Sequence, residues 1–234
     1  MNKLILIPVL ILCLTYSLYA QKSDFTSPEY AGSKALLFEF EGLSLIKADN
    51  FEGGIGGKYF FTNNLAGRVG LQFGYSKETI PATVTPGFIG IDGVRSGTTF
   101  GISLAAEYHL SHERLSPFIG GGLGITTTST DSKPSLTYPA GAVPPGQPET
   151  KDRIGGENVG GATYIAGTDF SVFGLVGIEY FITEKIGLSA EYRLSFQSLS
   201  EADEVDNGFT IRGNKVSQIQ IASAGFITIA FYFD

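Results

Sequence analysis

Residues 173–196 read FGLVGIEYFITEKIGLSAEYRLSF, and the second half of this stretch decides the fold. Apolar or aromatic residues occupy every even position from 186: Ile186, Leu188, Ala190, Tyr192, Leu194 and Phe196. The odd positions are small or polar and include Glu191 and Arg193. Successive side chains of a strand point to opposite faces, so the pattern predicts one strand with an apolar face and a polar face. Helical spacings of three and four residues fail here.

The same alternation recurs along the chain and predicts eight strands. They cover about residues 35–46, 51–62, 65–78, 97–110, 116–128, 168–182, 186–198 and 217–233. Strands of this length exceed the usual globular length of about 5–6 residues and suit a tilted membrane crossing of ~9–11 residues. The alternation is imperfect in 168–182, where Phe173, Leu175 and Phe181 occupy the otherwise polar face.

The connections between these strands alternate in length. Tight turns are expected at 63–64, 111–115 and 183–185. The links at 79–96, 129–167 and 199–216 are long and polar. The first link, 47–50, is the exception to this alternation, because it is short where a long loop is expected. Short turns at one end and long loops at the other are typical of a transmembrane β-barrel. An even number of strands places both chain ends on the short-turn side, the periplasm. We therefore expect an all-β, eight-stranded, antiparallel up-and-down transmembrane β-barrel.

The composition of the two faces indicates which one is outside. A soluble barrel would need a solvated outer face, but here the polar face is mostly Gly, Ala and Ser with single charges. Eight strands leave an interior with room for little beyond side chains, which suits this face. Aromatic residues gather near the strand ends, as in the two girdles of a membrane barrel. The expected girdles comprise Tyr59, Phe61, Tyr108, Tyr180, Phe231 and Phe233 near the periplasmic end, and Phe51, Phe73, Tyr75, Phe100, Phe170 and Phe196 near the outer end.

The N-terminus has the features of a secretory signal peptide. Lys3 precedes an apolar run, Leu4 to Leu14, and Ala20 is a suitable last residue before cleavage. A single-span anchor is the alternative, but the run is shorter than the ~20 apolar residues that a spanning helix needs. We expect residues 1–20 to be the signal peptide, 21–34 a periplasmic N-terminal segment and 35–234 the outer-membrane barrel domain. No later stretch offers ~18 uninterrupted apolar residues, so no transmembrane helix is expected.

The net charge and the cysteine content exclude some classes of function. The net charge of the 234-residue chain is -7, which argues against a nucleic-acid partner. Cleavage after Ala20 would remove the one Cys and the one Met, which excludes disulfides and cysteine metal sites in the remaining chain.

The signal peptide, the eight amphipathic strands, the alternating turn lengths and the aromatic C-terminal strand together resemble the OmpA/OmpX-like superfamily of small outer-membrane β-barrels. The resemblance covers roughly residues 35–234. It implies the barrel fold, outer-membrane lipid around it, and recognition of the C-terminal strand by the barrel-assembly machinery. Family members usually end in an aromatic residue, whereas here Phe231-Tyr232-Phe233 is followed by Asp234, which puts the efficiency of that recognition in doubt.

Alternation directs nine charged residues into the lumen, the interior of the barrel. They are Glu39, Glu41, Glu52, Lys58, Arg68, Glu107, Glu179, Glu191 and Arg193. Lys58, Arg68, Glu107 and Glu179 lie at similar distances from their turns and could meet in one layer. An unpaired charge in a water-poor lumen costs several kcal/mol, so we interpret the set as a salt-bridge plug. A gate whose ion pairs exchange to let ions pass is the alternative.

The sequence matches known enzymatic and metal-binding motifs only weakly. His109-Leu110-Ser111 has the His-x-Ser spacing of an outer-membrane lipid A deacylase, but His109 should face the lumen beside a periplasmic turn. We interpret it and His112 as solvated turn residues. The acidic stretch EADEVDNG, residues 201–208, partly matches a calcium loop, but Val205 replaces a ligand and Asn214 replaces the closing Glu. A solvated acidic loop is therefore favoured. We expect no enzyme activity, no metal site and no cofactor.

The long loops are the expected route to function. Residues 129–167 contain five prolines and many Ser, Thr and Gly, which indicates a flexible or extended surface loop. Loops on a rigid framework often carry binding sites. We expect a structural or surface-interaction role, with an extracellular ligand of the loops as partner; the alternative is a narrow channel for small solutes or ions.

Overall fold

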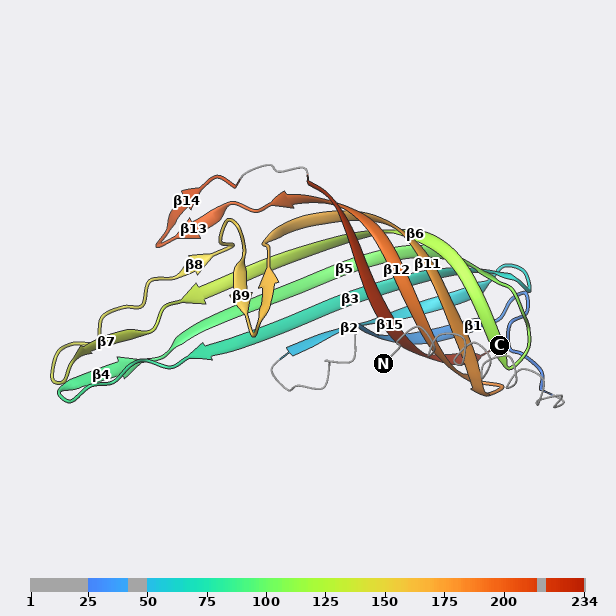
Figure 1. Ribbon diagram of the computed structural model, residues 1–234, viewed down its shortest axis with the longest axis horizontal. Helices are drawn as coiled ribbons and strands as arrows, with labels where there is room; N and C mark the ends of the chain where they lie inside the picture. Colours follow the sequence, from blue (N-terminus) through green and yellow to red (C-terminus); the bar gives the residue numbers. More distant parts are fainter. Residues whose placement is uncertain (1–24, 42–49, 214–217, 234) are drawn as a thin grey trace, which may run out of the picture.

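Eight long antiparallel strands form a closed ring in the computed structural model, which describes residues 25–41, 50–213 and 218–233 (Figure 1). Each strand pairs with the next one around the ring, and the last pairs with the first. The ring consists of β1 (Lys34–Glu41), β2 (Asn50–Phe60), β3 (Leu65–Ile80), β5 (Gly93–His109), β6 (Leu115–Lys133), β11 (Gly167–Thr183), β12 (Ile186–Glu201) and β15 (Gln218–Phe233). No helix in these described ranges is long and apolar enough to cross a membrane.

The eight predicted strands are confirmed, with longer bounds at one end of the ring. β5 begins four residues earlier than predicted, and β6 continues to Lys133 instead of ending at 128. The short turns lie at one end, which we call the short-turn end. Lys34, where β1 begins, pairs there with Phe233, where β15 ends. The opposite end is the long-loop end. The predicted signal peptide, residues 42–46 of the predicted first strand, and Asp234 lie outside the described residues.

The predicted assignment of faces is also confirmed. In β12, Leu188, Tyr192 and Leu194 are exposed, whereas Glu191 and Arg193 between them are buried. The apolar face therefore points out of the ring and the polar face into the lumen. The exceptions to strict alternation, Phe173, Leu175 and Phe181, are buried in the lumen as their positions in the strand require. Alternation thus decides side-chain direction even where it places an aromatic ring on the polar face.

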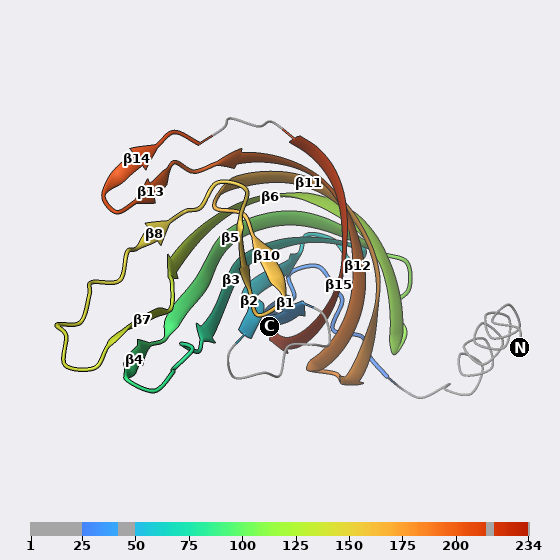
Figure 2. The same ribbon diagram turned by 60° about the vertical axis from the view of Figure 1, so that its left-hand side comes forward.

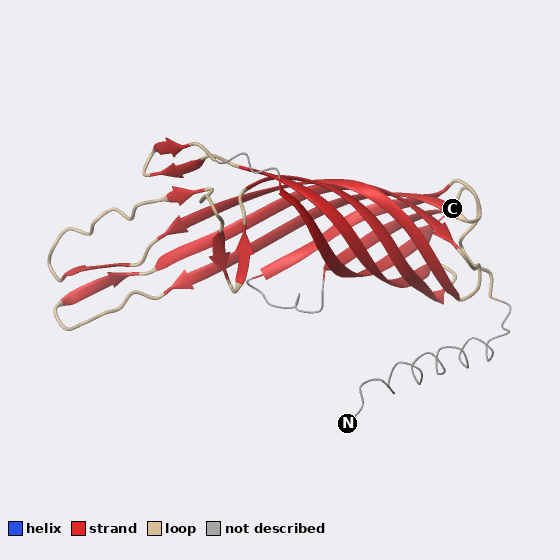
Figure 3. Cartoon of the chain, turned by 45° about the horizontal axis from the view of Figure 1, so that its top comes forward, coloured by secondary structure: helices blue, strands red, loops and turns tan. Residues whose placement is uncertain are grey.

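Residues 129–167 contain more regular structure than a flexible or extended loop. Within this segment lie β7 (Leu136–Pro139), β8 (Thr150–Lys151), β9 (Glu157–Val159) and β10 (Ala162–Tyr164). β7 pairs with β4 (Phe88–Ile91) in a separate two-stranded sheet. β8 pairs with β6 and with β13 (Glu204–Asp206), which pairs in turn with β14 (Phe209–Ile211). Strands β3, β5 and β6, labelled in Figure 1, extend beyond the rest of the ring toward β4 and β7, and the same extension is seen from another side in Figure 3.

A hairpin formed by β9 and β10 folds into the long-loop end of the ring (Figure 2). Its two-residue turn is Gly160-Gly161, and both glycines have positive φ angles, +61° and +90°. A type I′ turn needs positive φ at both positions, which glycine adopts without a steric penalty. The hairpin contacts β3, β5 and β6. It therefore fills the mouth of the barrel instead of projecting outward.

Candidate functional site

Buried ion pairs cross the lumen near the short-turn end, where Lys58 and Glu107 each lie two residues from the last residue of their strand. Lys58 Nζ lies 3.0 Å from Glu107 Oε2 and 3.0 Å from Glu179 Oε2, and these three side chains are almost fully buried. Lys58 is on β2 and Glu179 is on β11, which lie four positions apart in the eight-stranded ring. The pair therefore joins opposite walls of the barrel.

A second pair crosses the lumen beside the first. The Arg68 guanidinium donates two hydrogen bonds to Glu191, with Nη1 2.8 Å from Oε2 and Nη2 3.0 Å from Oε1. Its Nη1 also lies 2.6 Å from Glu107 Oε1, and its Nε lies 3.5 Å from Glu39 Oε1. β3 and β12 are again opposite strands. The planar guanidinium matches a carboxylate at two points, which fixes the geometry of this crossing.

Arg193 continues the network toward the long-loop end. It contacts Glu191 through Nε and Glu39 through Nη2, the latter at 3.1 Å. Its guanidinium carbon lies 3.8 Å from the centre of the Phe226 ring, a cation–π contact that also shields the charge from solvent. Seven of the nine predicted lumen charges thus form one network: Glu39, Lys58, Arg68, Glu107, Glu179, Glu191 and Arg193. The side chains of Glu41 and Glu52 lie outside the part that the structure describes.

Apolar side chains close the short-turn end below this network. The buried cluster consists of Ala35, Leu37, Phe60, Ala66, Phe181, Ala230 and Tyr232. Phe25, from the segment before β1, stacks on Phe181 with a centroid distance of 5.7 Å. Tyr232 donates a hydrogen bond from its hydroxyl to Glu179 Oε1 at 2.8 Å, which joins the apolar cluster to the charged layer. The aromatic rings leave this end of the lumen filled.

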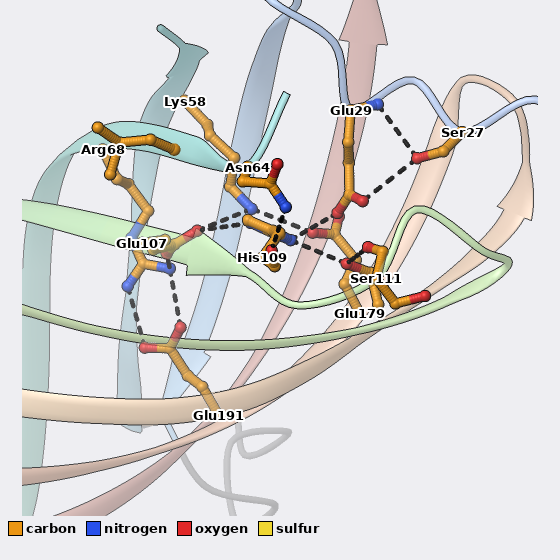
Figure 4. Close-up of polar contacts among 12 residues, drawn as sticks. Ser27, Glu29, Lys58, Asn64, Arg68, Glu107, His109, Ser111, Glu179 and Glu191 are labelled. Carbon is orange, nitrogen blue, oxygen red and sulfur yellow. Dashed lines mark hydrogen bonds and ion pairs between the residues drawn. The ribbon is translucent and has the colours of Figure 1, made fainter. Parts of the chain in front are cut away.

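The segment that precedes β1 adds a charged residue that the alternation rule could not identify. Glu29 is buried, and its carboxylate points toward His109 (Figure 4). Glu29 Oε1 lies 2.5 Å from His109 Nδ1. The backbone holds this segment in place, because Gly32 N–H donates to the Phe60 carbonyl oxygen at 2.8 Å. Residues 25–33 have no strand alternation, so the sequence carried no signal for this contact.

The interpretation of His109 as a solvated turn residue is wrong. Its side chain is 0% exposed, because it ends the inward face of β5 and packs between the Phe60 and Phe118 rings, 5.2 Å from each centroid. His112, in the following turn, is exposed as expected. The hydroxyl nearest to His109 Nδ1 belongs to Ser116, at 3.0 Å. Of the His109-Leu110-Ser111 motif, His109 therefore faces the lumen at the short-turn end, as its position in the strand predicted, whereas Leu110 is exposed.

A second apolar cluster fills one side of the lumen. Phe118, Phe173 and Leu175 pack together with Ala105. Lys58 Nζ lies 5.5 Å from the centre of the Phe118 ring. At Gly177, an added Cβ would clash with the Phe118 ring, so glycine in the wall makes room for aromatic side chains inside.

The β9–β10 hairpin closes the long-loop end. Glu157 is buried and lies 2.8 Å from Arg95 Nε, on the inner face of β5. The N–H of Gly160 donates to Glu78 Oε2, on the inner face of β3, at 3.2 Å. The Tyr164 ring covers Gly97 so closely that an added Cβ would lie 2.7 Å from the ring. The sequence contains a signal for this hairpin, since Gly160-Gly161 separates two short runs with Val and Tyr.

The aromatic residues predicted for the girdles face out of the ring. Exposed side chains at the short-turn end are Tyr59, Phe61, Tyr108, Tyr180, Phe231 and Phe233. Those toward the long-loop end are Phe73, Tyr75, Phe100, Phe170 and Phe196, and the side chain of Phe51 lies outside the described part.

The acidic stretch 201–208 does not form a ligand cage in the structure. Asn207 and Gly208 form the turn between β13 and β14, with φ angles of +48° and +82°. Asp203 accepts a hydrogen bond from Gly213 N–H and Glu204 accepts one from Ile154 N–H. Among the described residues, the carboxylates of this stretch take no part in a potential metal-binding group.

A closed antiparallel ring with an apolar outer face and a polar lumen crossed by ion pairs defines a small β-barrel of the membrane-spanning class. Residues 9–214 match the family described as outer membrane protein beta-barrel domain, and the chain belongs to this family. The protein is thus an integral outer-membrane protein, and its apolar outer face contacts lipid. No curated protein matches the sequence significantly.

Solved barrels with similar folds have little sequence in common with this chain. The N-terminal barrel domain of Pseudomonas aeruginosa OprF is 15% identical, with a TM-score of 0.41, and the match covers 87% of this chain and 98% of that one. Neisserial surface protein A is 15% identical, with a TM-score of 0.40 and coverage of 86% and 93%. OprG from P. aeruginosa is 8% identical, with a TM-score of 0.41 and coverage of 90% and 99%. Likeness at this level carries no conclusion about this chain.

Proposed function

We propose that this protein is a closed, non-enzymatic outer-membrane scaffold that presents its long-loop end for contact with an extracellular partner. In this proposal residues 1–20 are a removed signal peptide, and the short-turn end with both chain ends faces the periplasm. The exposed aromatic residues form the two interfacial girdles, and the C-terminal strand is recognised by the barrel-assembly machinery.

The observation that carries the proposal is that described side chains obstruct the lumen at three levels. The apolar cluster around Phe60 occupies the short-turn end, the ion pairs cross the lumen next to this cluster, and the β9–β10 hairpin occupies the long-loop end. An eight-stranded barrel has space for little more than its own side chains. A solute would have to displace all three layers, so a structural or surface role is favoured over transport.

The outermost loops support the surface-contact part of the proposal. Residues 81–91 and 134–148, which include β4 and β7, contain no charged residue. Their exposed apolar side chains include Val84, Phe88, Ile89 and Val143, the last of which is 89% exposed. Exposed apolar residues that gather at one place typically mark an interaction surface. We call these two segments the uncharged tip.

Adhesion of cells that produce the protein tests this surface. We expect Val84→Ser, Phe88→Ser and Ile89→Ser together to reduce adhesion to an apolar surface, measured by partition of cells between water and hexadecane. The matched control is Val69→Ser, Leu71→Ser and Leu104→Ser, whose outward side chains face lipid. Adhesion that stays equal for the tip variant, at equal amounts of folded protein, would contradict the surface-contact role.

A narrow channel is the second candidate, and one feature of the network favours it. Arg68 contacts Glu39, Glu107 and Glu191 at once, so it has alternative partners within reach. If Arg68 moved from one of these carboxylates to another, the carboxylate it left would keep a second cation: Lys58 for Glu107, and Arg193 for Glu39 and Glu191. The two candidates differ in ion conductance, since a scaffold gives none and a channel gives discrete current steps.

A further inference from the structure

Three donor groups that could ligate a metal meet at the short-turn end of the lumen. Glu29, His109 and Glu179 each offer one ligand atom, and these atoms all lie within 4.8 Å of one another. The three residues come from the segment before β1, from β5 and from β11, and all are buried. One imidazole and two carboxylates are a donor set that suits a divalent transition metal.

The contact between Glu29 and His109 is not an ordinary hydrogen bond. Glu29 Oε1 lies 2.5 Å from His109 Nδ1, yet no donor among the described residues is in hydrogen-bonding geometry with this oxygen. The Ser116 hydroxyl donates to the Ser111 carbonyl oxygen at 2.8 Å, so its oxygen accepts from Nδ1–H at 3.0 Å. The single proton on Nδ1 is thus directed to Ser116, and Glu29 Oε1 is left without one. A cation between the two atoms would give Oε1 a partner and would take the place of the proton on Nδ1.

The other imidazole nitrogen has the partner that a metal-bound histidine needs. Nε2 of His109 is buried, lacks a hydrogen bond and lies 3.5 Å from Glu107 Oε2. If Nδ1 binds a cation, the proton of the neutral ring resides on Nε2 and points toward this carboxylate. A carboxylate behind a ligating histidine is the usual outer contact of zinc sites, where it fixes the tautomer and the ring orientation.

Charge balance also favours a divalent cation. The described part of the network and Glu29 contain five carboxylates: Glu29, Glu39, Glu107, Glu179 and Glu191. The permanent cations in contact with them in the lumen are Lys58, Arg68 and Arg193. Two negative charges therefore remain when His109 is neutral, and uncompensated charge in a low-dielectric lumen is costly.

From this geometry we propose that Glu29, His109 and Glu179 bind one divalent transition-metal cation, with zinc as the best match. Zinc takes nitrogen and oxygen ligands at about 2.0–2.2 Å in tetrahedral geometry, and three protein ligands leave a fourth position. Tetrahedral ligands at this length lie about 3.4 Å apart, so Glu29 Oε1 must move away from His109 Nδ1, which is 2.5 Å from it, when the metal binds. Glu179 Oε1 can keep the hydrogen bond from Tyr232 and still use its second lone pair. Lys58 stays on Oε2 of the same carboxylate.

The bound cation would act as a latch at the short-turn end. Glu29 belongs to the segment before the barrel, whereas His109 and Glu179 belong to two strands of its wall. A shared metal joins this segment to the barrel, and its binding free energy adds to the stability of the folded state. This inference is independent of the proposed scaffold function, because a closed lumen does not require the metal.

Zinc content of the purified protein tests the proposal. The untagged full chain, extracted from membranes and stripped with EDTA, is incubated with zinc chloride, desalted and analysed by inductively coupled plasma mass spectrometry. We expect about one zinc per folded chain and a higher thermal unfolding midpoint with zinc than with EDTA. Glu29→Gln and His109→Gln should each weaken binding by about tenfold or more.

Two matched variants separate this site from adventitious binding. Glu39→Gln removes another lumen carboxylate and Glu184→Gln removes an exposed carboxylate in the turn after β11, and both should retain zinc. Because Glu29 precedes the strands, Glu29→Gln decides the question even if His109→Gln does not fold; folding is checked by the heat-modifiable gel shift. Wild-type protein that retains no zinc would overturn the proposal, as would zinc that is kept unchanged with Glu29→Gln or lost with Glu184→Gln.

Discussion

Arg68 and Glu191 face each other from opposite walls of the barrel and are joined by two hydrogen bonds of 2.8 and 3.0 Å. Lys58 and Glu179 make the neighbouring crossing at 3.0 Å. Since these four side chains are almost completely buried, the lumen is blocked where they meet. The closed character of the barrel thus depends on a small number of charged residues, whose removal has predictable consequences.

Lys58→Ala should destabilise the folded barrel. The change leaves Glu107 and Glu179 without their shared cation, and removing one partner of a buried ion pair costs roughly 3–5 kcal/mol. The urea midpoint of the barrel in lipid vesicles, followed by the heat-modifiable gel shift, should fall. Lys77→Ala, on the exposed face of β3, is the control and should leave the midpoint unchanged. An equal midpoint for Lys58→Ala and wild type would refute the plug.

Arg68→Lys keeps the charge but should still lower stability. A lysine ammonium cannot donate the two parallel hydrogen bonds that the guanidinium makes to Glu191. The loss of one charge-assisted hydrogen bond corresponds to about 1.5–3 kcal/mol in the free energy of unfolding. Equilibrium unfolding in urea should place this variant between wild type and Arg68→Ala. Full stability of Arg68→Lys would show that only the charge matters.

Phe118→Ala tests the apolar packing within the lumen. Phe118 is 1% exposed and packs against Phe173 and Leu175, so truncation leaves a cavity. Loss of a buried phenylalanine costs about 3–5 kcal/mol. Ile119→Ala, at the next residue, faces out of the barrel and should lower the unfolding free energy less. Equal losses for the two variants would mean that the interior is not tightly packed around Phe118.

Gly97→Ala should displace the β9–β10 hairpin from the mouth of the barrel. The added methyl group would lie 2.7 Å from the Tyr164 ring, which must move away. Hydrogen exchange measured by mass spectrometry should become faster in residues 157–164 and stay unchanged in the wall of the barrel. Gly174→Ala is the control, because an added Cβ there meets nothing within 4 Å. Unchanged exchange in the hairpin would contradict the close packing of Tyr164 on Gly97.

Local alternation explains how much of the fold could be predicted. In β12 the side chains of Leu188 and Glu191 point outward and inward as their positions require, because the two-residue period of a strand is a local property. The partners of the lumen charges were less predictable. Lys58 and Glu179 are far apart in sequence, and their meeting depends on the closure and stagger of the ring, which alternation does not specify.

Features formed by short or irregular segments escaped prediction for a related reason. The β9 and β10 strands have three residues each, too few for an alternation signal, although Gly160-Gly161 is a hairpin turn motif. Glu29 enters the lumen from a segment with no periodicity. His109 was assigned to solvent because it precedes a turn, whereas the inward direction of its position in β5 decides its burial. In each case a tertiary contact outweighs the local pattern.

Planar-bilayer conductance of the purified wild-type barrel tests the closed lumen most directly. The folded state is confirmed beforehand by the heat-modifiable gel shift, and a known porin in the same bilayer serves as the positive control. We predict no current steps for the wild type over the voltage range in which the bilayer itself is stable. Reproducible current steps that change in size with Arg68→Ala or Lys58→Ala would contradict the closed scaffold and establish the ion pairs as a gate.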